Sequence, residues 1–171
     1  MKEIRFSNKQ ATLAAIITLP FIVTATIIAV AIYGKQFFEG QDNIMTIIVC
    51  MLNLVICVPH ELLHAAGFMV GGKKWNELEF GLNLPFSVFI KFHGKMGMKA
   101  FRIGLVMPFI FTALIPMMAG AASGCFLLFI TGVIQATACG SDLLSFICSF
   151  SFKSNDIVVD IEKGTGYAVL I

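Results

Sequence analysis

The segment His60-Glu61-Leu62-Leu63-His64 carries the residue types of a metal-dependent hydrolytic site. On a helix, side chains four positions apart project from the same face about 6 Å from each other, which suits a tetrahedral metal with Zn–N bonds near 2.0–2.1 Å. A glutamate one position further can reach a metal-bound water and accept its proton as the water attacks a carbonyl. The pattern predicts that His60 and His64 bind zinc and that Glu61 is the catalytic base.

A catalytic zinc takes three protein ligands and leaves a position for water, so a third ligand has to come from elsewhere in the chain. Asp142, in the segment Gly140-Ser141-Asp142, is the favoured candidate because it is predicted to lie at the same membrane depth as the two histidines. A cap at a helix break after Gly140 is the alternative role for Asp142. Cys57 and Cys139 lie one turn before His60 and Asp142, so a thiolate ligand also stays open.

The elements that position these side chains are too apolar for a soluble domain. Hydrophobic residues make up 58% of the 171 residues and charged residues 13%, against about 45–50% and 25% in typical globular chains. Residues 11–33, 44–71, 103–122 and 125–150 are each long enough to cross a bilayer. We expect an all-α integral membrane protein with about four transmembrane helices and one membrane-embedded domain, residues 1–171. An ionisable side chain inside such a span costs about 2.5–3.5 kcal/mol and usually marks function, which singles out Glu61 and Asp142.

Polar side chains also follow one helix face on each of the second and fourth spans, which predicts a polar contact between these spans. Pro59, directly before His60, predicts a kink in the second span. The two polar faces consist of Thr46, Asn53, Cys57, His60 and His64 on one span and of Thr131, Gln135, Asp142, Ser145 and Ser149 on the other.

Residues 78–92 alternate between apolar and polar side chains, which is the period of a β-strand. Pro85 cannot donate a ladder hydrogen bond, so this insertion is an edge strand or two short strands. His93, which follows it, is an open candidate for contact with substrate or metal. The tail predicts a second short hairpin, residues 157–161 and 167–171, around the turn at residues 163–166.

The cations predict the orientation in the membrane, because cytoplasmic flanks collect Lys and Arg. Eleven of the twelve Lys and Arg residues are predicted to lie on one side of the membrane, and only Lys35, between the first two spans, is predicted on the other. Both termini are therefore expected on the cytoplasmic side. The net charge of +2 is too small and too scattered to indicate binding to nucleic acid. The eleven cations are Lys2, Arg5, Lys9, Lys73, Lys74, Lys91, Lys95, Lys99, Arg102, Lys153 and Lys163.

With its HELLH span, β-like insertion and Gly140-Ser141-Asp142 on the last span, the chain resembles the small bacterial membrane zincins, a family related in architecture to the site-2-type intramembrane metalloproteases. The resemblance covers most of the chain. It implies that His60, His64 and Asp142 bind Zn²⁺, that Glu61 activates water, and that a hairpin such as residues 78–92 holds an extended substrate by strand addition. It also implies a bacterial cell membrane. Leu143 follows Asp142 here, where those proteases have an Asp-Gly pair.

These observations favour a zinc-dependent, membrane-embedded metallopeptidase that hydrolyses a peptide bond of a membrane-bound or membrane-proximal polypeptide. Its expected partners are lipid and that substrate. The alternative is a non-catalytic membrane adaptor or immunity-type protein with a structural metal site. A metal transporter is disfavoured, since it needs ionisable residues at several depths, whereas those of this chain cluster at one depth.

Overall fold

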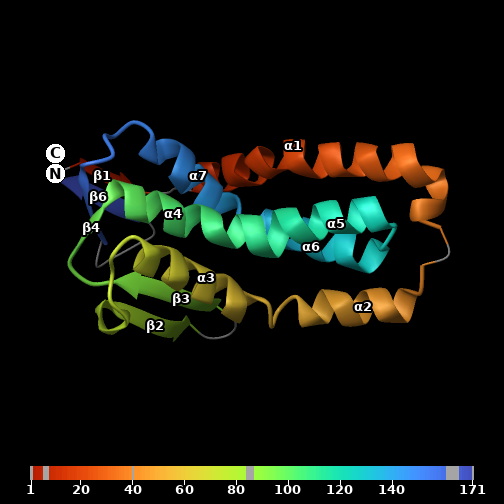
Figure 1. Ribbon diagram of the computed structural model, residues 1–171, viewed down its shortest axis with the longest axis horizontal. Helices are drawn as coiled ribbons and strands as arrows, with labels where there is room; N and C mark the ends of the chain where they lie inside the picture. Colours follow the sequence, from red (N-terminus) through yellow and green to blue (C-terminus); the bar gives the residue numbers. More distant parts are fainter. Residues whose placement is uncertain (1, 6–7, 40, 84–86, 161–165, 171) are drawn as a thin grey trace.

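The computed structural model describes residues 2–5, 8–39, 41–83, 87–160 and 166–170, and most of them are helical. Two long, nearly continuous helical segments run side by side along the molecule (Figure 1). One is α1 (Asn8–Tyr33), which continues into the 3₁₀ turn η1 (Gly34–Phe37). The other begins with α4 (Met98–Pro108) and continues through the π-helical segment η3 (Phe109–Leu114) into α5 (Ile115–Ser123). The stretches Ile16–Phe37 and Met98–Ser123 of these segments are long and apolar enough to cross a membrane.

The other two predicted spans are broken rather than continuous, which corrects the expectation of single helices over residues 44–71 and 125–150. Helices α2 (Asn43–Leu52) and α3 (Cys57–Val70) are bent by 42°, and α6 (Phe126–Ala138) and α7 (Gly140–Ser149) by 52°. Counting each bent pair as one span, the described residues provide up to four. The first break begins at Asn53, whose side-chain amide and backbone N–H both donate to the carbonyl of Val49.

Pro59 lies inside the first turn of α3 and not at the break itself. The first four N–H groups of a helix have no intrahelical partner, so a proline is tolerated there without a kink. The kink that the sequence predicts at Pro59 is therefore found a few residues earlier.

The predicted insertion forms a hairpin of two short strands, β2 (Leu78–Asn83) and β3 (Ser87–Phe92), which pair antiparallel after the 3₁₀ turn η2 (Trp75–Glu77). The two-strand interpretation of residues 78–92 is thus confirmed, although Pro85 lies outside the described residues. The tail also forms its predicted hairpin, β5 (Ile157–Asp160) with β6 (Gly166–Leu170). Residues 163–165 of the predicted turn between these strands are outside the described part.

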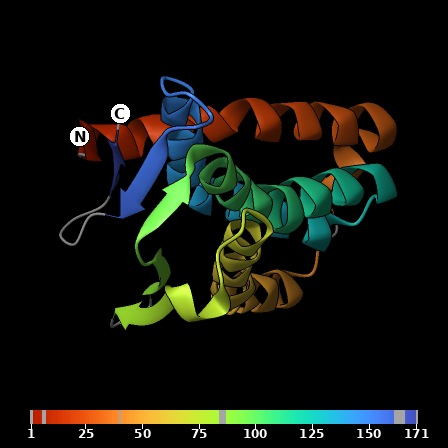
Figure 2. The same ribbon diagram turned by 60° about the vertical axis from the view of Figure 1, so that its left-hand side comes forward.

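The tail hairpin belongs to a larger sheet that the sequence did not predict. Its order is β1-β6-β5-β4, because β1 (Lys2–Arg5) pairs with β6 and β4 (Lys95–Gly97) pairs with β5. Figure 2 shows this sheet at the end of the helices where both termini lie. The largest buried cluster joins it to α3 and α4 through Phe68, Phe92, Phe101, Val158 and Tyr167.

Candidate metal centre

His60 and His64 lie on successive turns of α3, and both are buried. Their ring centroids are 5.0 Å apart. The break before Cys57 starts a new helix, so this pair belongs to the first two turns of α3 and not to the middle of a long span. Two imidazoles therefore project together from one helix face, as their spacing predicts.

Asp142 meets both histidines from the opposite span. Its Oδ2 atom lies 3.3 Å from His60 Nε2 and 3.4 Å from His64 Nε2. Asp142 lies in the first turn of α7, directly after the break between α6 and α7. The N-cap residue of this helix is Cys139, and it makes no side-chain capping hydrogen bond. The structure thus brings the three predicted ligands to one point.

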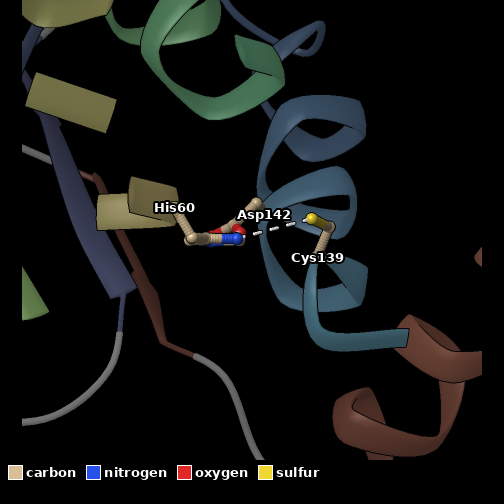
Figure 3. Close-up of side chains that lie close together, drawn as sticks. All are labelled: His60, Cys139 and Asp142. Atoms are coloured by element: carbon tan, nitrogen blue, oxygen red, sulfur yellow. Dashed lines mark hydrogen bonds and ion pairs between the residues drawn. The ribbon is translucent and has the colours of Figure 1, made fainter. Parts of the chain in front are cut away.

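The other ring nitrogens of the two histidines face separate groups. His64 Nδ1 lies 2.9 Å from the carbonyl oxygen of Gly104 on α4, and a carbonyl only accepts, so this nitrogen carries the proton. His60 Nδ1 lies 3.7 Å from the Sγ atom of Cys139 (Figure 3). Metal-binding histidines in proteins are usually held in this way by a group on the nitrogen that does not bind the metal.

A pair of buried amides connects the two broken spans. The side chain of Gln135 on α6 donates to Asn53 Oδ1 at 3.0 Å and approaches the Asn53 backbone carbonyl at 3.4 Å. The exposed fractions of these residues are 2% and 4%. The polar faces predicted on the second and fourth spans therefore meet. The Gln135 amide approaches the backbone carbonyl of Asn53, which the break between α2 and α3 leaves without a helical partner.

Glu61 turns toward a cavity of about 280 Å³ that also borders His64 and Asp142. The candidate ligand atoms of His60, Glu61 and His64 lie within 4.8 Å of one another. Four successive residues of β3, from Phe89 to Phe92, form one side of the same cavity. A carboxylate, a metal-ligand set and a strand therefore share one opening.

Of the other candidates, only Cys139 joins this cluster among the described residues. Cys139 is fully buried and groups with His60 and Asp142. His93 is exposed on the hairpin, where its Nε2 atom lies 3.2 Å from Glu79 Oε2. Cys57, half-buried, is in neither group of possible ligands.

The sequence analysis missed Gly104 and Tyr167. Gly104 acts through its backbone carbonyl, which no side-chain pattern reveals. Tyr167, on β6, lines the cavity from the tail of the chain, and burial raises the pKa of its phenol, so the hydroxyl stays protonated at neutral pH. An alternating strand pattern gave no indication that this side chain reaches α7.

The donor set fits zinc. Two imidazole nitrogens and one carboxylate oxygen are a usual catalytic ligand set, and they leave a position for water. His64 Nδ1 donates its proton to the carbonyl of Gly104, so in the neutral ring Nε2 carries a lone pair that faces the Asp142 carboxylate. Nε2 and the carboxylate oxygen are then two acceptors 3.4 Å apart, and they need a cation or an added proton between them. A Zn²⁺ ion would satisfy all three groups.

Comparison with known proteins agrees with this geometry. A family model described as "Putative zincin peptidase" matches residues 54–157, which is more than half of the chain and includes all four candidate site residues. No curated protein and no solved structure gives a significant match.

Proposed function

The chain belongs to this zincin peptidase family, and from that premise we propose that it is a zinc-dependent, membrane-embedded metalloendopeptidase that cleaves a membrane-bound or membrane-proximal polypeptide. The observation that carries the proposal is the convergence of His60 Nε2 and His64 Nε2 on Asp142 Oδ2 within 3.4 Å, beside Glu61 and an open cavity. A merely structural polar cluster has no need of a cavity beside the Glu61 carboxylate.

In the proposed mechanism His60, His64 and Asp142 hold the metal, and Glu61 moves the proton. When bound, Zn²⁺ polarises the scissile carbonyl and lowers the pKa of a water toward about 7. Glu61, half-buried at the cavity, accepts the proton of the attacking water and delivers it to the leaving amine. Gly104 and Cys139 keep the two imidazoles oriented from their Nδ1 sides.

The hairpin supplies a binding edge for an extended substrate. Strand β3 pairs with β2 on one side, and the backbone of Ile90 on β3 interacts with the carboxylate of Glu61. An extended peptide that added to this edge would pass directly over Glu61 and the ligands. We propose that strand addition along residues 89–92 aligns the scissile bond.

The arrangement of charges supports a cytoplasmic position for the end that carries both termini. The four-stranded sheet pairs β1 with β6 at the two ends of the chain, and it also contains β4 with Lys95. Lys35 lies in η1, which follows α1 at the opposite end of the molecule (Figure 1). With this orientation, which the positive-inside rule favours, the site would lie near the cytoplasmic face of the membrane.

The first experiment measures the zinc content of the detergent-purified protein and of the variants His64→Ala, Asp142→Ala and Glu61→Gln. We expect about one zinc per chain in the wild type, a loss in the first two variants, and retention in Glu61→Gln, because a proton acceptor is not a ligand. A wild type that binds no zinc after reconstitution would overturn the proposal.

Cleavage is then tested on a mixture of proteome-derived peptides in the same detergent, with new termini identified by mass spectrometry. The zinc-loaded wild type should produce termini that the zinc-loaded Glu61→Gln variant does not. Identical peptide patterns from the two proteins, with the metal bound in both, would favour the alternative of a non-catalytic adaptor with a structural metal.

A further inference from the structure

The cavity that begins at the metal centre continues well beyond it. From Glu61 and Asp142 it extends past α4 to Tyr167 on β6, over a volume of about 280 Å³. The candidate ligands and the catalytic carboxylate occupy only one end of this space. The rest lies next to the position of the scissile bond and has no role in the chemistry described above.

Stacked rings form a wall of the cavity that leads away from the metal centre. The His64 and Phe68 rings are stacked at 6.2 Å, and the Phe68 and Phe101 rings are parallel within 2° at 6.5 Å. Phe101 then contacts Tyr167, with ring centroids 4.7 Å apart. Phe68, Phe101 and Tyr167 are each buried, and Leu105 adds a further apolar side chain to the lining. Such a wall favours a flat or bulky apolar group.

Most of the described residues that line the cavity beyond the metal centre are apolar, although Ser141 and Ser145 also border it. The Tyr167 hydroxyl donates to the Ser145 carbonyl at 3.2 Å, so its proton is already used. Among the described lining residues Lys91 carries the one charge outside the site itself, and its Nζ atom lies 5.4 Å from the centre of the Phe89 ring. A charged substrate side chain placed against the aromatic wall would lose its hydration without gaining a partner there.

We propose that this space is a specificity pocket, which takes a large apolar side chain, preferably aromatic, from the substrate residue adjacent to the scissile bond. The inference rests on the proposed peptidase function and names its substrate class. The whole cavity, including its end at the metal centre, measures about 280 Å³, which is below the about 300–1,000 Å³ of pockets for whole drug-sized ligands, so the part beyond the centre suits a single side chain. Full burial of an aromatic side chain here should increase affinity about 10- to 100-fold over a methyl group.

The test uses two series of hydroxamates, which bind zinc in place of the scissile amide, with the zinc-loaded full chain in detergent. N-acetyl amino acid hydroxamates place the side chain on the acyl side, and 2-substituted succinyl hydroxamates place it on the amine side. Each series carries benzyl, methyl and carboxymethyl groups, and calorimetry gives the Kd. In one of the two series benzyl should bind about 10- to 100-fold more tightly than methyl, and carboxymethyl should bind more weakly than methyl.

Variants at Leu105 link the preference to this pocket. Leu105→Trp fills the pocket, so it should abolish the preference for benzyl over methyl. Leu128→Trp, at an exposed position of α6, is the matched control and should keep the preference. If zinc content or thermal melting shows that Leu105→Trp does not fold, Leu105→Ala replaces it and should shift the preference toward a larger naphthylmethyl group.

Equal Kd values for benzyl and methyl in both series, or tighter binding of carboxymethyl, would overturn the pocket while leaving the zinc site intact. A benzyl preference that persists in Leu105→Trp would also overturn it. Failure of the wild type to bind zinc is a different result, because it removes the proposed function and this inference with it.

Discussion

Replacement of Gly67 by alanine tests whether close contact between α3 and α4 holds the metal centre. Gly67 faces Gly104, and a Cβ atom on Gly67 would lie 2.5 Å from Gly104 Cα and 2.8 Å from its nitrogen. Both of these atoms belong to the backbone, so no side chain can rotate away to make room. The same Gly104 supplies the carbonyl that binds His64 Nδ1 at 2.9 Å.

The magnitude follows from these distances. Carbon atoms in ordinary contact are about 3.5 Å apart, so the helices would have to separate by about 1 Å at the crossing. The separation from Gly104 O to His64 Nδ1 would then grow to about 3.9 Å, beyond the 3.2 Å limit of an N–H···O hydrogen bond. Loss of such a supporting bond lowers metal affinity about 10- to 100-fold, or about 1.4–2.7 kcal/mol.

Competition with a chromogenic chelator in detergent measures the zinc Kd of wild type and variant. Gly97→Ala is the matched control, because a Cβ there meets nothing within 4 Å and the backbone has a φ of −68°, so its affinity should not change. A Gly67→Ala protein with a Kd within twofold of the wild type would refute the reasoning. So would a gain in stability, which an uncrowded helix-interior alanine brings by about 0.5–1 kcal/mol.

Three further predictions concern one group at the site and two elsewhere in the fold. Cys139→Ala should lower zinc affinity about 10-fold, whereas Cys139→Ser should stay within about threefold, since a hydroxyl also orients His60; equal losses in both variants, by chelator competition, would make the thiol a ligand instead. Glu77 accepts the Lys74 N–H at 2.8 Å, which lowers its carboxyl pKa below the ordinary 4.5. Its contribution to stability is therefore present above pH 4.5 and lost as the pH falls through the lowered pKa, so the Tm difference between wild type and Glu77→Gln should vanish in acid; a difference that persists there would contradict this. Arg102 donates to the Ser149 carbonyl at 2.7 Å and the Phe152 carbonyl at 2.8 Å, so Arg102→Ala should lower the unfolding free energy by at least about 2 kcal/mol, and Arg102→Lys should not restore it, as denaturant melts will show.

The candidate ligands could be predicted from the sequence because their spacing is a local property. His60 and His64 share a face of any helix that contains them, and the cost of polar groups in an apolar span marks them out. Asp142 needed a second argument, its depth along another span, and depth is fixed by a helical rise that hardly varies. The strand pattern of residues 78–92 is local in the same way, so the hairpin was predicted too.

What could not be predicted depends on contacts between distant segments. Strands β1 and β4 are only four and three residues long, and each is stabilised by a partner from the tail. Tyr167 looks like any apolar strand residue until the sheet packs against α7. The carbonyl of Gly104 and the thiol of Cys139 reach the histidines through helix packing, which has no period in the sequence.

The two breaks explain how a helical membrane protein brings these groups together. A helix start leaves N–H groups unpaired, which is expensive in lipid unless protein groups or a cavity surround them. The backbone of α1 packs closely against the start of α7, because a Cβ on Gly140 would lie 2.7 Å from the carbonyl oxygen of Ala14. Asp142 follows in the first turn of α7, where the helix dipole favours a negative side chain. Among the described residues α1 contributes no candidate ligand, yet it packs against α7, the helix that carries the Asp142 carboxylate to His60 and His64.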